Sequence, residues 1–147
     1  MSTPIEELVL VDASAVIGMM QPASADHSAC AAVGNALPVG KSLICWPVVT
    51  EAVHILGKRP HHVGQFLASL RRGWLSLLQL TVDDIEGIRR VMDNYDDQEV
   101  DLADAAIVHL ANRENIRTVF TLDRRHFRLF TREDGTLFRL LPDDFTA

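Results

Sequence analysis

Few lysines, few cysteines and no long apolar run characterise this sequence of 147 residues. No stretch reaches the roughly 20 apolar residues of a membrane-spanning helix, and Glu6 and Glu7 stand where a secretory signal carries Lys or Arg. Cys30 and Cys45 lie far apart in the sequence, so they form neither a CxxC metal motif nor a disulfide framework. We therefore expect two reduced core cysteines in a cytoplasmic protein that makes no membrane contact.

The charge balance is acidic, because 20 Asp and Glu outnumber 14 Lys and Arg and give a net charge of −6. Phosphate binding usually requires a basic surface, so this balance alone argues against a nucleic-acid partner. Cations bound by several of the acids would reverse that argument locally. A hydrophobic content of 48% at this length predicts a single domain, residues 1–147, with one core.

Short apolar segments alternate with amphipathic helical segments along the chain. This alternation predicts an α/β fold with a mainly parallel sheet and right-handed crossovers. The predicted strands are Glu7–Asp12, Ser42–Cys45, Trp74–Leu80, Thr118–Thr121 and Thr136–Leu141. The leucines of Trp74–Leu80 also allow a helix. Helices are predicted over Ala25–Leu37, Val48–Leu56 and His61–Arg72. Three more are predicted to begin at Ala13, at a capping box that starts with Thr81, and at Asp101.

Two acids follow predicted strands, namely Asp12 and Asp123. Ligands of parallel sheets bind at the carboxyl ends of the strands, beside a point where strand order reverses. We therefore expect both acids at the same edge of the sheet. Taken alone, Asp12 could cap the helix that follows it and Asp123 could be a turn residue.

Asp101 and Asp104 open an apolar helix with i, i+3 spacing, which places both carboxylates on one face. A buried carboxylate requires a partner, and no Lys or Arg lies within one turn of either acid in the sequence. A bound cation would supply the partner that these carboxylates require. The alternative is that Asp101 caps the helix and Asp104 complements the helix dipole.

Glu51, on the helix after the second strand, completes the candidate cluster of Asp12, Glu51, Asp104 and Asp123. Taken alone, it could be a solvent-facing acid. Together these like charges repel one another unless cations bind, and an all-oxygen set favours Mg²⁺ or Mn²⁺ over zinc. Such ions activate water for hydrolysis of phosphodiester bonds, so cleavage of a nucleic-acid backbone is the expected reaction class.

Ser14 and Thr121 lie close to the acids in sequence, so we expect their hydroxyls to hydrogen-bond the acids or waters on the metal. Four other residues receive structural interpretations. We expect hydrogen-bonded core histidines at His54 and His109, and core aromatic side chains at Trp46 and Trp74.

The order of these motifs resembles a PIN-domain ribonuclease of the VapC toxin kind over nearly the whole chain. The motifs that carry the resemblance are Val9-Leu10-Val11-Asp12-Ala13-Ser14, Trp46-Pro47-Val48-Val49-Thr50-Glu51-Ala52, Asp101-Leu102-Ala103-Asp104-Ala105-Ala106 and Thr121-Leu122-Asp123-Arg124-Arg125-His126-Phe127. Their order and spacing together are specific, although no single motif is.

The resemblance implies a PIN-like three-layer α/β/α fold with a four- to five-stranded mainly parallel sheet. It implies Mg²⁺ or Mn²⁺ held by Asp12, Glu51, Asp104 and Asp123, with Asp101 as an additional or outer ligand. It also implies endonucleolytic cleavage of RNA that leaves a 5′-phosphate and a 3′-hydroxyl. The implied partners are a second copy, in a homodimer, and a small cognate antitoxin that lies across the active site and offers an Arg to the acids.

Two other enzyme classes place an Asp after the first strand. Haloacid-dehalogenase phosphatases require a second acid two residues on, where this chain has Ser14. Receiver domains require paired acids at the end of the first strand and a Lys late in the sheet, but Lys41 and Lys58 lie in the wrong half of the chain. The remaining alternative is a catalytically silent PIN fold that binds RNA or protein.

Overall fold

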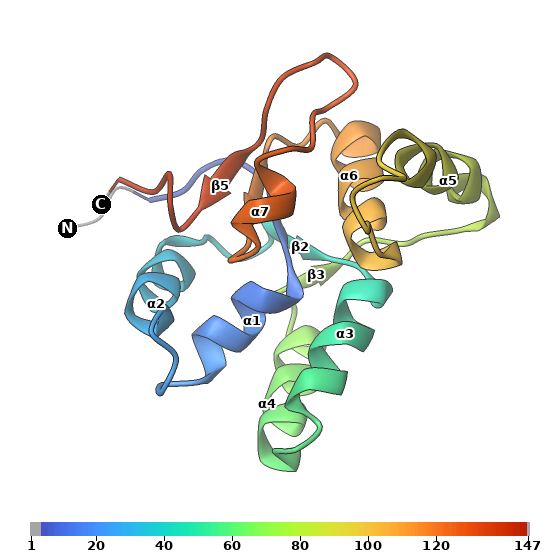
Figure 1. The fold of residues 1–147 in the computed structure, drawn as a ribbon. Helices are drawn as coiled ribbons and strands as arrows, with labels where there is room; N and C mark the ends of the chain where they lie inside the picture. Colours follow the sequence, from blue (N-terminus) through green and yellow to red (C-terminus); the bar gives the residue numbers. More distant parts are fainter. Residues whose placement is uncertain (1–3, 147) are drawn as a thin grey trace.

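The computed structural model describes residues 4–146 and contains a five-stranded sheet in which all neighbouring strands are parallel. The strands are β1 (Val9–Val11), β2 (Ser42–Ile44), β3 (Ser76–Leu77), β4 (Thr118–Phe120) and β5 (Arg139–Leu141). Their order across the sheet is β3-β2-β1-β4-β5, so the direction of chain progression reverses between β1 and β4 (Figure 1). The predicted α/β fold is confirmed.

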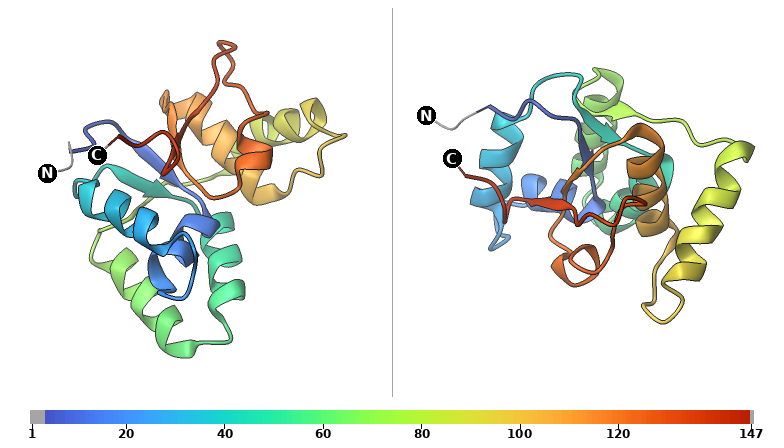
Figure 2. Two further views of the ribbon diagram at one scale, coloured as in Figure 1. Left: turned by 60° about the vertical axis from the view of Figure 1, so that its left-hand side comes forward. Right: turned by 90° about the horizontal axis from the view of Figure 1, so that it is seen from above.

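Helices cover both faces of the sheet. They are α1 (Ala13–Met20), α2 (His27–Ala36), α3 (Trp46–Leu56), α4 (Pro60–Arg71), α5 (Ile85–Asn94), α6 (Leu102–Glu114) and α7 (Arg124–Phe127), with a 3₁₀ turn over Val82–Asp84. Right-handed crossovers put α1 to α4 on one face and α5 to α7 on the other, as Figures 1 and 2 show. Among the helices of residues 4–146, none combines the length and the apolar character required to cross a membrane.

The central strands are buried along their whole length, as expected for parallel strands covered by helices on both faces. Their apolar side chains pack into one cluster with the inner faces of the helices, and α6 contributes most of its first three turns to it. Cys30 and Cys45 are free and buried in this cluster, as predicted. The sheet and α6 therefore form a rigid base beneath the edge that carries Asp12.

The connection into α5 confirms the predicted capping box. The backbone N–H of Thr81 donates to Asp84 Oδ2 over 2.8 Å, and the Thr81 hydroxyl accepts from the backbone of residue 83. Asp84 also lies 2.8 Å from His109 Nε2, and this hydrogen bond is the main reason why its pKa is lowered. His109 is thus the hydrogen-bonded histidine that the sequence predicts, and Gly87 gives its ring the space to lie against α5.

Several local predictions are wrong. Trp46, the first residue of α3, is 59% exposed and His54 is also exposed, because both lie on the side of the helix that lines an open groove. The strand predicted over Trp74–Leu80 shortens to β3, because this edge strand pairs with β2 alone. The fifth strand begins only at Arg139, because Leu137 forms an antiparallel bridge instead. The prediction for Trp74 is confirmed, because this side chain packs against the core while remaining partly exposed.

Candidate metal centre

Asp12 and Asp123 follow the two strands that meet where the strand order reverses. Val11 of β1 pairs with Phe120 of β4, and the backbone N–H of Asp12 donates to the Phe120 carbonyl over 2.9 Å. The structure therefore brings Asp12 directly beside Thr121 and places Asp123 just beyond it. This is the position where open parallel sheets bind ligands.

Two hydroxyls hold the buried carboxylate of Asp12. Thr121 Oγ1 donates to Asp12 Oδ2 over 2.7 Å, and Ser14 Oγ donates to the same oxygen over 3.0 Å. Asp12 begins α1, but its side chain makes no capping hydrogen bond there. Burial raises the pKa of Asp12, while the two hydroxyls oppose that rise by stabilising the anion. The Asp12 carboxylate is therefore held by Thr121 and Ser14 and does not cap α1.

The same hydroxyls fix the loop that carries Asp123. Ser14 Oγ accepts the backbone N–H of Leu122 over 2.9 Å, and Thr121 Oγ1 accepts the backbone N–H of Asp123 over 3.0 Å. A change at either hydroxyl would therefore move two acids at once.

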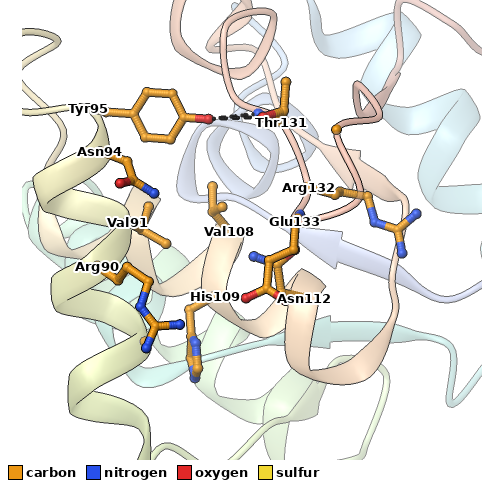
Figure 3. A pocket seen from close by; sticks show the side chains of 12 residues that line it. Arg90, Val91, Asn94, Tyr95, Val108, His109, Asn112, Thr131, Arg132 and Glu133 are labelled. Atoms are coloured by element: carbon orange, nitrogen blue, oxygen red, sulfur yellow. Dashed lines mark hydrogen bonds between the residues drawn. The ribbon is translucent and has the colours of Figure 1, made fainter.

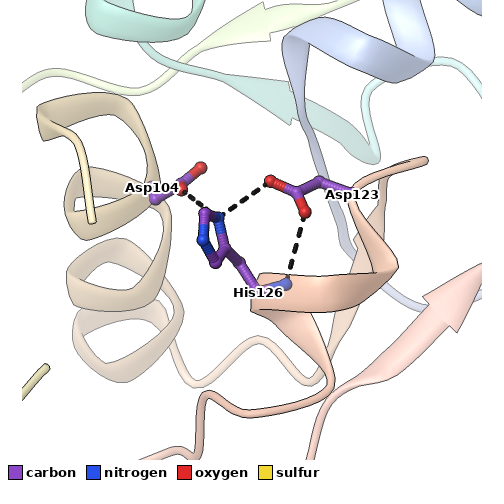
Figure 4. Close-up of side chains that lie close together, drawn as sticks. All are labelled: Asp104, Asp123 and His126. Atoms are coloured by element: carbon purple, nitrogen blue, oxygen red, sulfur yellow. Dashed lines mark hydrogen bonds and ion pairs between the residues drawn. The ribbon is translucent and has the colours of Figure 1, made fainter. Parts of the chain in front are cut away.

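Asp101 and Asp104 have separate tasks at the start of α6. Asp101 is exposed, and its Oδ1 accepts the backbone N–H of Asp104 over 2.8 Å, so it caps the helix. Asp104 is only 5% exposed and points from the first turn toward Asp123 (Figure 4). Within residues 4–146 it pairs with no Lys or Arg, and the one basic side chain within ion-pair distance is His126.

His126 joins the two acids, although the sequence did not identify it as a site residue. Its Nδ1 lies 3.1 Å from Asp123 Oδ2 and 3.4 Å from Asp104 Oδ2 (Figure 4). The available signal was the i, i+3 spacing of Asp123 and His126, which becomes a contact because Asp123 caps the short helix α7. Among the described residues, these three side chains form the tightest potential ligand group, with their atoms within 4.8 Å of one another.

Glu51, on α3, faces the same cluster. Burial, followed by the charges of Asp101, Asp12 and Asp123, raises the pKa of Glu51 to about 7. Burial and the charges of the same acids, with Glu51 added, raise the pKa of Asp104 to about 8. The five predicted acids thus converge on one region and repel one another, which is the situation that a bound cation relieves.

The donors present fit a hard divalent ion. Carboxylate oxygens dominate the cluster, one imidazole nitrogen accompanies them, and both cysteines are buried elsewhere. The buried carboxylate of Asp104, which among residues 4–146 has no cationic partner other than an imidazole, is the strongest sign that the cluster is built around a positive charge. Mg²⁺ and Mn²⁺ accept this donor set.

A groove of about 650 Å³ opens from the acid cluster between α3 and the start of α6. Its walls include Glu51 and Asp101 from the cluster, and the exposed side chains of Trp46 and Leu102. The groove contains no Lys or Arg among its lining residues. It therefore suits an uncharged flat group better than a phosphate.

A second cavity, of about 440 Å³, lies between α5, α6 and the loop at Thr131–Gly135 (Figure 3). Arg90, His109 and Glu133 line it, and none of the predicted site residues does. The acid cluster is thus separate from this cavity.

Residues 9–132 match the PIN domain family, and the chain therefore belongs to that family. Its relatives include Ribonuclease VapC26 of Mycobacterium tuberculosis, which is 33% identical over 138 residues, an alignment that covers 91% of this chain and 100% of the relative. The crystal structure of Mycobacterium tuberculosis VapC20, described as a sarcin-ricin loop cleaving toxin, has the same fold. It superposes with a TM-score of 0.69 at 18% identity and covers 79% of this chain and 90% of VapC20.

Proposed function

We propose that the protein is a metal-dependent endoribonuclease and the toxin of a toxin–antitoxin pair. The observation that carries the proposal is the convergence of Asp12, Glu51, Asp104 and Asp123 on the sheet edge, with the pKa of the buried Asp104 raised to about 8. Membership of the PIN domain family and the similarity to Ribonuclease VapC26 support the choice of RNA as the substrate.

The four acids would hold Mg²⁺ or Mn²⁺, and Asp101 would add an outer ligand at the rim. When bound, such an ion lowers the pKa of water and neutralises charge on the phosphate. The reaction we propose adds water to phosphorus and releases the 3′-oxygen, which leaves a 5′-phosphate and a 3′-hydroxyl. Thr121 and Ser14 would keep the Asp12 carboxylate anionic and correctly oriented.

The groove beside Glu51 would receive a base next to the scissile phosphate. Trp46 offers an exposed indole face, and unpaired bases stack on such faces without charge neutralisation. Arg125 on α7 is exposed and has no acid within ion-pair distance among residues 4–146, whereas Arg124 and Arg128 pair with Asp143 and Asp144. Arg125 is therefore the residue of α7 most available to a phosphate.

We further propose that residues 1–147 form one PIN domain that acts in the cytoplasm as a homodimer. A small antitoxin would inhibit it by laying an Arg across the acids, since an acidic cluster attracts a guanidinium.

The direct test is incubation of a panel of structured RNAs with the purified protein in Mg²⁺, in Mn²⁺ and in EDTA, followed by analysis of the product ends. We expect cleavage with either ion, none in EDTA, and 5′-phosphate ends. Cleavage that persists in EDTA, or products with 2′,3′-cyclic phosphate ends, would contradict the proposal. Binding of RNA without cleavage under all three conditions would favour the catalytically silent PIN fold.

A further inference from the structure

The imidazole of His126 occupies the space between Asp104 and Asp123. Its Nδ1 lies 3.1 Å from an oxygen of Asp123 and 3.4 Å from an oxygen of Asp104. The His126 side chain is 21% exposed and that of Asp104 is 7% exposed, so the contacts lie largely away from bulk water. Two acidic side chains and one imidazole therefore already converge on one point.

The spacing of these atoms matches that of neighbouring ligands on one octahedral ion. Bonds of about 2.2 Å at right angles place adjacent ligand atoms about 3.1 Å apart, and opposite ligand atoms about 4.4 Å apart. The two distances to Nδ1 agree with the first value, and the 4.8 Å limit for the whole group accommodates either arrangement of the two oxygens.

We propose that His126 supplies Nδ1 as a third protein ligand to a divalent ion held by Asp104 and Asp123. The inference rests on the proposed metal centre and extends it by a residue that is not an acid. Nδ1 must carry a free lone pair for this role, so the ring proton resides on Nε2 in the metal-bound state.

Two contacts hold α7 and the imidazole of His126 in place. The backbone N–H of His126 donates to Asp123 Oδ1 over 3.3 Å, which fixes the start of α7. The imidazole stacks on Phe130, with ring centroids 6.1 Å apart and planes 23° apart, and Phe130 is itself fully buried. This stacking contact limits rotation of the imidazole, so Nδ1 stays beside the two acids.

An imidazole ligand should shift the choice of ion. Mg²⁺ prefers oxygen ligands, whereas Mn²⁺ also accepts a nitrogen ligand. We therefore expect His126→Ala to weaken Mn²⁺ binding by roughly tenfold or more. Mg²⁺ binding should change by less than about threefold.

The test is electron spin-echo spectroscopy of Mn²⁺ bound to the RNA-free protein, prepared once with ¹⁴N-histidine and once with ¹⁵N-histidine. We expect a directly bonded nitrogen in the wild-type spectrum that changes with the isotope. The nitrogen signal should disappear in His126→Ala and in His126→Gln, whose amide oxygen keeps a ligand in place. His54→Ala is the matched control, because His54 lines the neighbouring groove and should leave the signal intact.

The possible results separate the inference from the metal centre itself. Stoichiometric Mn²⁺ binding that Asp104→Asn abolishes, without a histidine nitrogen in the wild-type spectrum, would overturn the role of His126 alone. A nitrogen signal that survives both His126 substitutions, or that His54→Ala removes, would also overturn it. Absence of Mn²⁺ binding to the wild type would refute the metal centre, and the role of His126 with it.

Discussion

Replacing Asp104 by Asn should stabilise the metal-free protein at alkaline pH, although it should abolish activity. Asp104 is buried beside Asp101, Asp12, Asp123 and Glu51, and its pKa is raised to about 8. The folded state therefore retains a proton on this carboxyl that the unfolded chain has already lost. The contribution of this protonated carboxyl to the free energy of unfolding is fully present below the ordinary Asp pKa. It is lost as the pH rises through about 8.

The magnitude follows from the size of this shift. The pKa rises from 3.8 to about 8, and each pH unit of difference corresponds to about 1.4 kcal/mol, which sets an upper value of about 6 kcal/mol. Relaxation of the site and the nearby His126 reduce this, so we expect Asp104→Asn to gain about 2 to 5 kcal/mol at pH 8.5. At pH 5 the gain should be less than half as large, because only about one unit of the shift then contributes.

The assay is urea denaturation of wild type and Asp104→Asn in EDTA at both pH values. Asp97→Asn serves as the control, because Asp97 is exposed and lies outside the cluster. Saturating Mn²⁺ should stabilise the wild type, by about 2.7 kcal/mol at a hundredfold excess over its Kd, and should leave Asp104→Asn unchanged. A variant that is less stable than wild type at pH 8.5, or a gain equal at both pH values, would refute the reasoning.

Four further substitutions probe other parts of the structure. Thr121→Val, which removes a buried hydroxyl, should lower the free energy of unfolding by about 1 to 3 kcal/mol in urea. Gly87→Ala would place Cβ 2.2 Å from His109 Nδ1 and should cost about 1 to 3 kcal/mol in the same assay, whereas Gly64→Ala, in open space on α4, should gain up to about 1 kcal/mol. Trp46→Ala should change stability by less than about 0.5 kcal/mol but weaken RNA binding roughly tenfold, as measured by fluorescence anisotropy. Equal RNA affinities of wild type and Trp46→Ala would exclude the stacking role.

Much of the fold could be predicted from short apolar runs and the residues that end them. Val9–Val11 and Thr118–Phe120 are continuously buried and mostly apolar because helices cover both faces of a parallel sheet, and an acid follows each soon after its end. The carboxyl ends of parallel strands lie at one edge of the sheet, so the proximity of those acids could be predicted without side-chain coordinates.

Long-range placement of single side chains could not be predicted in the same way. Trp46 and His54 have apolar neighbours in the sequence, but they lie on the face of α3 that lines the groove, whereas Val48 and Ala52 point into the core. The contact of His126 with Asp104 depends on a one-turn helix that Asp123 caps, and its few residues show no helical period. The capping hydrogen bond of Asp101, by contrast, joins residues that are close in sequence, and helix capping is one of the two roles that the sequence alone already indicates for this residue.

The most direct test of the account compares RNA cleavage rates in Mn²⁺ for the cluster variants with that of Asp97→Asn. The cluster variants are Asp12→Asn, Glu51→Gln, Asp104→Asn and Asp123→Asn. Each should lose roughly a hundredfold or more in rate, because each removes a charge proposed to hold the ion, while Asp97→Asn should cleave within about twofold of wild type. Wild-type rates in the cluster variants would show that these acids do not form the catalytic centre.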